Sequence, residues 1–235
     1  MKGKLYLIPN LLGGDDLSLL PPQIKEVLAG LDILIVENIK IVRRFLVKLG
    51  LKPKINELEF FELDKHQKER HFKHYLEGAE TGKNIGLISD AGCPAIADPG
   101  AKIVKSAHER GITVVPLVGP SSIFLALMAS GLNGQNFAFN GYIPIPPAQR
   151  SQQIKSLEQL SKRKNQTQIF IETPYRNNKL LASILNNCED KTRLCIASEI
   201  TLPTAFIQTK TIREWRVNTP ELHKKPTIFL LLGFR

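Results

Sequence analysis

Short apolar runs alternate with helical patterns along the first half of the chain. Runs rich in Ile, Leu and Val predict strands near residues 4–9, 32–36, 55–61, 84–88 and 112–118. Between most of these runs, apolar residues recur at helical spacing, as Ile103, Val104 and Ala107 do within residues 101–110. Because strands that alternate with helices need crossover connections, the pattern predicts an α/β domain with a mainly parallel sheet.

The second half continues the alternation and then changes it. Strands are expected near residues 136–142, 167–172, 192–199, 204–210 and 226–232, with helices near 150–163 and 175–187. The spacing between strands shortens after Glu199, which predicts antiparallel pairing for the later strands. We therefore expect two α/β domains, residues 1–118 and 119–235, with parallel to mixed sheets.

Two loops at the ends of predicted strands have the composition of ligand-binding turns. One spans residues 89–100 and begins Ser-Asp-Ala-Gly-Cys-Pro; the other is Gly-Pro-Ser-Ser at 119–122, and each leads into a helical pattern. Open α/β folds bind ligands at the carboxyl ends of strands, where glycine lets the backbone approach a ligand closely. The same residue types also form ordinary turns between strands and helices, so composition alone leaves both interpretations open.

Composition bounds the class of protein. Hydrophobic residues make up 43% of the 235 residues, which excludes a disordered chain, and the longest apolar stretches have only the length of strands. No apolar segment of the kind found in signal peptides follows Met1, and the three cysteines form no Cys-x-x-Cys pair. We therefore expect a cytoplasmic protein that does not span a membrane.

The net charge of +10 is unevenly distributed. Up to Leu117 there are 17 Lys and Arg against 15 Asp and Glu, a balance of +2; the remainder has 15 against 7, a balance of +8. Basic residues in the second half that could line a surface for a polyanion are Lys162, Arg163, Lys164, Arg176, Lys179, Lys191 and Arg193. The alternative is a set of solvated helix faces and loop lysines.

The order of the two loops resembles a known family. Ser-Asp-Ala-Gly-x-Pro-x-x-x-Asp-Pro-Gly, followed about twenty residues later by Val-Val-Pro-Leu-x-Gly-Pro-Ser, is similar to the S-adenosylmethionine-dependent tetrapyrrole methylase superfamily. The chain looks most like the branch that 2′-O-methylates a cytidine of small-subunit ribosomal RNA. Further segments that resemble the family are Leu5–Pro9, Leu63–Gln67, Phe137–Pro144, Ile171–Arg176 and Ala197–Thr201.

The chain also departs from the family. After the first strand, Thr-Pro-Ile-Gly-Asn is replaced by Pro9-Asn10-Leu11-Leu12-Gly13-Gly14, and the Glu-Asp-Thr-Arg-His motif is reduced to Glu37-Asn38-Ile39-Lys40. Leu202 stands where the family has a lysine. The cofactor loops match best and the motifs on the substrate side match worst.

The resemblance implies a cofactor, S-adenosylmethionine, in a cleft between the two domains, and it implies a homodimer. It implies that the residues in contact with the cofactor are Pro9, Asp90, Ala91, Gly92, Cys93, Ser121, Ser122, Glu172, Thr173, Pro226 and Thr227. Because the cofactor already carries an activated methyl group, no metal or nucleophile is needed; His71 and His74 fit a polar helix face, and we expect no metal.

A general base would help if the acceptor is a ribose hydroxyl. The candidates are Glu37, Asp64, His66 and Glu199. For each residue taken singly, a cap or a salt bridge is a more common role than catalysis. Three functions remain open: methylation of ribosomal RNA, methylation of a tetrapyrrole or other small molecule, and binding of cofactor or RNA without catalysis. The basic second half favours the RNA substrate, and the intact cofactor loops favour an enzyme.

Overall fold

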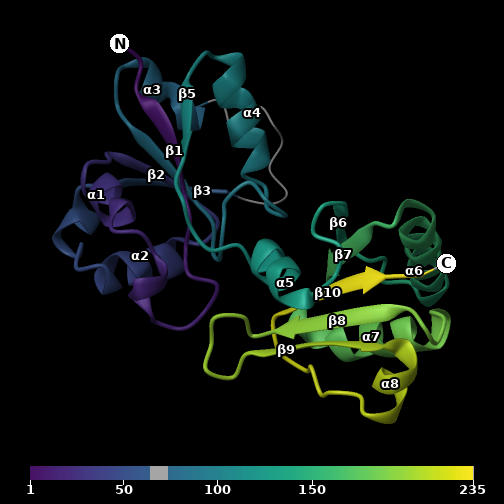
Figure 1. Cartoon of the computed structure of the whole chain (residues 1–235). Coiled ribbons are helices and arrows are strands. Elements are labelled where there is room, and N and C mark those ends of the chain that lie inside the picture. The colour runs from purple at the N-terminus through teal and green to yellow at the C-terminus, as the bar shows by residue number, and fades with distance from the viewer. Residues whose placement is uncertain (64–73, 235) are drawn as a thin grey trace. The chain divides into compact units, whose positions relative to one another are not determined.

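The computed structural model describes residues 1–63 and 74–234. The chain forms two compact units, Met1–Ser121 and Ser122–Arg235, each with its own sheet (Figure 1). The two units are called unit 1 and unit 2 below.

Unit 1 is a parallel sheet of five strands in the order β3-β2-β4-β1-β5. The strands are β1 (Lys4–Ile8), β2 (Ile33–Val36), β3 (Glu59–Glu62), β4 (Ile85–Ile88) and β5 (Thr113–Pro116). The helices are α1 (Gln23–Ala29), α2 (Ile39–Lys48), α3 (Glu77–Glu80) and α4 (Ala101–Glu109). The central strands β2 and β4 are buried along their whole length, which explains their continuous apolar runs.

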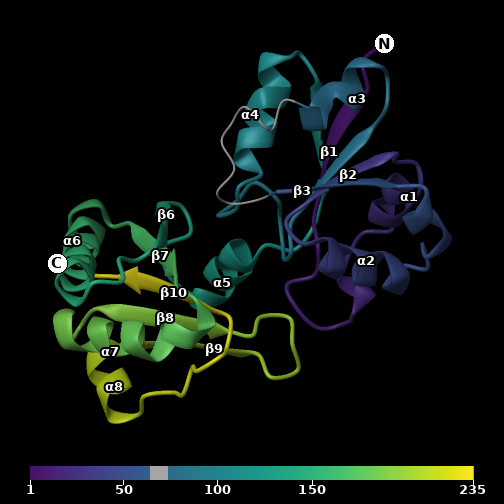
Figure 2. The same cartoon turned by 180° about the vertical axis from the view of Figure 1, so that it is seen from behind.

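Helices cover both faces of this sheet. Ile24 and Leu28 of α1 pack with Phe45 and Leu46 of α2 in one core cluster, while residues of α3 and α4 pack in another on the opposite face (Figures 1 and 2). The parallel α/β architecture expected from the sequence is confirmed. The strand expected near 55–61 begins later, because Pro53 opens a short 3₁₀ helix, Pro53–Asn56, ahead of β3.

Unit 2 is a mixed sheet in the order β6-β7-β10-β8-β9. The strands are β6 (Phe137–Tyr142), β7 (Thr167–Ile171), β8 (Arg193–Ser198), β9 (Phe206–Thr211) and β10 (Thr227–Leu232). The helices are α5 (Ser122–Ser130), α6 (Pro147–Lys164), α7 (Asn177–Asn187) and α8 (Ile212–Val217). Only β6 and β7 are parallel, so the predicted antiparallel pairing of the later strands is confirmed.

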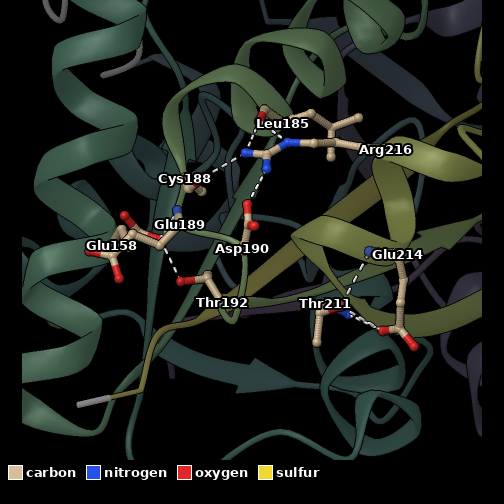
Figure 3. A network of polar contacts seen from close by, with 9 residues as sticks. All are labelled: Glu158, Leu185, Cys188, Glu189, Asp190, Thr192, Thr211, Glu214 and Arg216. Atoms are coloured by element: carbon tan, nitrogen blue, oxygen red, sulfur yellow. Dashed lines mark hydrogen bonds and ion pairs between the residues drawn. The ribbon is translucent and has the colours of Figure 1, made fainter.

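One face of the unit 2 sheet carries α6, α7 and α8, and the other carries α5. The periodicity of the sequence did not predict α8, which is only six residues long and starts at a capping box of Thr211 and Glu214. Arg216 of this helix donates hydrogen bonds to the carbonyl oxygens of Leu185 (2.7 Å) and Cys188 (3.0 Å) and pairs with Asp190 (Figure 3). A single guanidinium thus satisfies carbonyl groups at the end of α7 and ties α8 to it.

Candidate functional site

Three loops of unit 1 meet at one edge of its sheet. Strands β4, β1 and β5 are adjacent and parallel, so the segments that follow them leave the sheet on the same side. These segments begin at Pro9, Ser89 and Leu117, and they include both loops singled out in the sequence. This edge is where α/β folds bind ligands.

Asn10 joins the first of these segments to the second. Its backbone N–H donates to the carbonyl oxygen of Gly92 (2.9 Å), and the Gly92 N–H donates back to Asn10 (3.2 Å). Its buried side chain donates from Nδ2 to the carbonyl oxygens of Ser89 and Asp90, both at 3.2 Å, and accepts from Leu11 N at 2.8 Å. One asparagine side chain and one backbone pair therefore anchor the Asp90–Gly92 segment to the end of β1.

The third segment packs against the other two. The Cys93 thiol lies 3.4 Å from the carbonyl oxygen of Pro120. At Gly119, a Cβ atom would lie 2.2 Å from Cβ of Pro9, so only glycine allows these two segments to touch. Pro9, Gly92, Cys93 and Gly119 thus form one packed group.

The loop after β4 contains strained backbone that an acidic side chain holds in place. Gly92, Ala95 and Ala97 all have positive φ angles of 61–69°, a region that costs an alanine about 1–2 kcal/mol. The Asp98 carboxylate accepts hydrogen bonds from Ala95 N (2.9 Å) and Gly100 N (2.7 Å). The loop therefore has one defined conformation in spite of its strain.

Glu37 reaches the same loop from the end of β2. Its Oε1 atom accepts a hydrogen bond from the backbone N–H of Asp90 at 3.2 Å. This contact places a base candidate beside the Asp90 loop, and it also gives Glu37 a role in positioning that loop.

In unit 2, a second polar group lies where β7 ends and β10 begins. Glu172 has a side chain that is 1% exposed, and its Oε1 accepts from Arg176 Nη2 (2.6 Å) and from Thr173 N (2.7 Å). Burial raises the pKa of Glu172, but the hydrogen bonds from Arg176 and Thr173 outweigh it, and the net pKa lies below its ordinary value. Glu172 is therefore held as a carboxylate.

The neighbouring strands complete this polar group. Thr227 donates to the Ser198 hydroxyl (3.1 Å) or to the Lys225 carbonyl (2.9 Å), and Glu199 donates its N–H to Pro226 O (2.8 Å). The Glu199 carboxylate lies 3.7 Å from Lys225 Nζ. Two buried acceptor atoms here, Glu172 Oε2 and Thr201 Oγ1, have no hydrogen-bond partner within the described residues. Both could accept a hydrogen bond from a ligand donor.

A family model decides what kind of protein carries these two polar groups. The model for Tetrapyrrole (Corrin/Porphyrin) Methylases matches residues 4–215. The chain belongs to this family. It is therefore a methyltransferase.

Curated relatives fall in the branch that the sequence resembles. "Ribosomal RNA small subunit methyltransferase I" of Buchnera aphidicola from Acyrthosiphon pisum is 30% identical over 99% of this chain and 80% of the relative. The protein of the same name from Vibrio cholerae is 29% identical over 98% of this chain and 77% of the relative. The one from Bacillus subtilis is 33% identical over 85% of this chain and 64% of its own length.

Solved structures share the fold of this methylase. "Crystal structure of the methyltransferase CobJ" superimposes with a TM-score of 0.66, at 18% identity, over 98% of this chain and 94% of the other. The cobalt precorrin-4 methyltransferase CbiF superimposes with a TM-score of 0.60, at 17% identity, over 97% of this chain and 94% of the other. The two-domain α/β fold predicted from the sequence is thus confirmed.

The structure gathers the predicted site residues of the methylase into two groups. Those in unit 1 are Pro9, Glu37, Asp90, Ala91, Gly92 and Cys93, with Ser121 at its end; those in unit 2 are Glu172, Thr173, Glu199, Pro226 and Thr227. Ser122 is the first residue of α5, which leaves Ser121 at the capping position. Asp64 and His66 lie outside the described residues. Their proposed roles stay predictions.

Sequence reasoning missed the residues that hold these groups together. Asn10 and Asp98 fix the loops of unit 1, and the pairing of Arg176 with Glu172 was not expected. A signal existed for Asp98, because an aspartate near glycine and proline commonly bonds nearby backbone N–H groups. Asn10 gave no local signal, since its partners lie 79 and 80 positions away.

Two residues of the predicted basic surface make ion pairs within unit 2. Lys162 pairs with Glu189, and Arg176 pairs with Glu172 at 2.6 Å. Lys162, Arg163 and Lys164 form the last turn of α6, where cations interact favourably with the helix dipole. Lys162 and Arg176 therefore have structural roles, and the surface for a polyanion expected at these cations stays a prediction.

Residues 1–63 and 74–234 contain no group of three or more His, Cys, Asp or Glu that could hold a metal ion. None of the helices described in these ranges has the length and apolar character needed to cross a membrane. His74, one of the two histidines of the candidate metal pair, packs edge-on against Phe61 and Tyr75; His71 lies outside the described residues.

Proposed function

We propose that this methylase transfers a methyl group from S-adenosylmethionine to a ribose 2′-hydroxyl of small-subunit ribosomal RNA. The observation that carries the proposal is the packed edge of unit 1, where Asn10 joins the Gly92 loop to the end of β1. The names of the relatives, which are small-subunit ribosomal RNA methyltransferases, support the choice of acceptor.

The polar atoms of the chain fit this cofactor. S-adenosylmethionine carries an amino group, two ribose hydroxyls and an adenine amine, all of which donate hydrogen bonds. The buried acceptors Glu172 Oε2 and Thr201 Oγ1 lack a donor among the described residues. In unit 1, the backbone of residues 90–93 supplies further polar groups. We propose that the polar group of unit 1 and the polar group of unit 2 each contact the cofactor; the cleft expected between the domains stays a prediction.

When bound, the cofactor supplies a methyl carbon that its sulfonium makes electrophilic. The chain has to hold the acceptor oxygen in line with that carbon and exclude water, which is worth up to about 7–11 kcal/mol. A base that takes the hydroxyl proton would add to this. Glu37 and Glu199 stay proposals for that base, and each is also engaged within its own unit, Glu37 with Asp90 N and Glu199 with Lys225.

The direct test offers the purified protein labelled S-adenosylmethionine with small ribosomal subunits and, separately, with total small metabolites. We expect label in the ribosomal RNA, at a ribose that is unmethylated in a strain lacking this gene. Label in a metabolite alone would establish the alternative, methylation of a tetrapyrrole or another small molecule, which the changed segments Pro9–Gly14 and Glu37–Lys40 leave open. Cofactor binding without transfer to either fraction would establish a non-catalytic relative.

We also propose that the protein is a cytoplasmic homodimer. The family resemblance supports the dimer, and the three unpaired cysteines support a reduced compartment. Sedimentation at micromolar concentration measures the assembly directly. A mass equal to the 26.3 kDa monomer would refute the dimer.

A further inference from the structure

Helix α2 presents a basic stripe to solvent. Val42, Phe45, Leu46 and Leu49 form its buried face at the spacing i, i+3, i+4 and i+7. On the outward side, Lys40, Arg43, Arg44 and Val47 follow at the same spacing and are all exposed. Residues 39–48 include four cations, counting Lys48, and no acidic residue.

This arrangement works against the helix that carries it. Lys40 and Arg44, and Arg44 and Lys48, are like-charge pairs at i,i+4, each of which destabilises a helix by about 0.2–0.5 kcal/mol. Lys40 is the second residue of α2, where the helix dipole disfavours a cation. By contrast, the cations of α6 lie in its last turn, where the dipole favours them. Helix stability therefore does not explain the charges on α2.

Few of these charges are neutralised. Lys48 pairs with Asp15, which is the one ion pair that α2 makes within residues 1–63 and 74–234. The Arg43 guanidinium lies 5.2 Å from the centroid of the Phe60 ring, a contact that orients the group and leaves its charge unbalanced. Arg43 and Arg44 therefore present adjacent guanidinium groups suited to phosphate oxygens, which they can bind through two hydrogen bonds at once.

The stripe begins at the candidate site. Asn38 caps α2 by accepting hydrogen bonds from Lys40 N (3.0 Å) and Ile41 N (3.4 Å). The preceding residue, Glu37, accepts from Asp90 N in the proposed cofactor loop. At 1.5 Å per residue, α2 then carries its cations away from that loop over about 12 Å, from Lys40 to Lys48.

We propose that the outward face of α2, formed by Lys40, Arg43 and Arg44, binds the phosphate backbone of the RNA substrate beside the methyl-transfer site. The inference rests on the proposed function for its substrate class. It moves the main RNA contact from unit 2, where Lys162 and Arg176 are paired, to a helix of unit 1. A compact small molecule would have no use for a row of cations of this length.

The test measures binding of small-subunit ribosomal RNA by fluorescence anisotropy at several salt concentrations. Each phosphate contact adds about 0.7–0.9 to the slope of log K against log salt. We expect Arg44→Glu to lower the slope by about that amount, and Arg43→Glu/Arg44→Glu by about twice as much. When salt rises from 50 to 200 mM, the factor by which RNA affinity falls should be about tenfold smaller for the double variant than for the wild type.

Lys105→Glu is the matched control. Lys105 is exposed on α4, which covers the face of the unit 1 sheet opposite to α2. Lys105→Glu changes the charge by the same amount as Arg44→Glu. It should leave the slope unchanged. Arg44→Gln, which removes the charge without reversing it, should give an intermediate affinity. Thermal unfolding should occur at or above the wild-type temperature in the Arg44 variants, where like-charge repulsion within α2 is relieved, and binding of S-adenosylhomocysteine should stay at the wild-type value in all four variants.

The two proposals fail in different ways. A slope that is the same for the wild type and Arg43→Glu/Arg44→Glu, in protein that is folded, would overturn the role of α2. A slope that falls as expected, in a wild-type protein that never labels small subunits, would leave α2 as an RNA-binding face and overturn the proposed methyl transfer. If Lys105→Glu lowers the slope of log K against log salt as well, the effect comes from net charge and not from α2, and the inference is overturned.

Discussion

Replacing Asn10 by alanine tests whether the packed edge of unit 1 holds the cofactor. The change removes three side-chain hydrogen bonds, two donated to Ser89 O and Asp90 O and one accepted from Leu11 N. Asn10 is 4% exposed, so water replaces these bonds poorly. At about 1 kcal/mol for each bond, and more for groups left unsatisfied, unit 1 should lose about 2–4 kcal/mol of stability.

The loss should appear in ligand binding as well as in stability. With the Asn10 side chain removed, the Asp90–Gly92 segment loses its bonds to that side chain and keeps the backbone pair between Asn10 and Gly92 and the bond from Asp90 N to Glu37. We expect calorimetry to show S-adenosylhomocysteine binding at least tenfold more weakly, which corresponds to about 1.4 kcal/mol. Asn10→Asp keeps the acceptor for Leu11 N but loses the donors and adds a negative charge beside two carbonyl oxygens; it should bind the ligand no better than Asn10→Ala.

Asn133→Ala is the control for a general loss of stability. Asn133 also makes three side-chain hydrogen bonds, to Asn165 O, Gln135 N and Asn136 N, but these lie where β7 begins, at the far end of that strand from Glu172. Urea unfolding followed by circular dichroism should show a smaller loss of stability for Asn133→Ala, because two of its three bonds are exposed to water. Normal ligand affinity in Asn10→Ala, or an equal drop in Asn133→Ala, would refute the reasoning.

Three further predictions concern single groups. Gly92→Val should abolish binding of S-adenosylhomocysteine in calorimetry. The φ of +69° at this position costs a residue with a side chain about 1–2 kcal/mol, and its Cβ would lie 3.0 Å from Leu12 Cδ2. Normal binding would show that this loop does not hold the cofactor. The pKa of Glu172 is lowered in the folded state, so the stability that its carboxylate contributes is complete above the ordinary pKa of 4.5 and is lost as pH falls through the lower folded pKa. Urea unfolding at a series of pH values should show this loss in the wild type and not in Glu172→Gln. Identical pH profiles for the two proteins would contradict the prediction. Iodoacetamide should modify Cys93 before the two other thiols, because Cys93 is only half-buried, and S-adenosylhomocysteine should slow the reaction; mass spectrometry that finds one of the buried thiols modified first would disprove this order.

Much of the fold follows from the sequence because its signals are local. Four-residue apolar runs such as Ile85–Ile88 have the length of buried strands, and crossover helices between them force parallel pairing. The loops at 89–100 and 119–122 could be predicted as site loops because they follow strands, and parallel strands end on one side of a sheet. The shorter spacing after Glu199 likewise predicted antiparallel pairing.

The strand order was decided only by tertiary structure. In unit 1, β1 lies between β4 and β5, and in unit 2 the last strand, β10, lies between β7 and β8. No local pattern distinguishes these neighbours, because pairing depends on which apolar faces pack against which helices. This order is what brings Pro9 and Asn10 beside Gly92 and Gly119.

The roles of individual polar residues were decided in the same way. By itself, the sequence determined the family resemblance, the two α/β halves and the loops expected to hold the cofactor. It could not separate the paired cation Lys162 from the exposed cations Arg43 and Arg44, because the partner of Lys162, Glu189, lies 27 positions away. Local chemistry sets which residues can form turns, caps and helices. Which charge is neutralised and which is presented to a ligand depends on contacts between distant segments, and only packing brings those together.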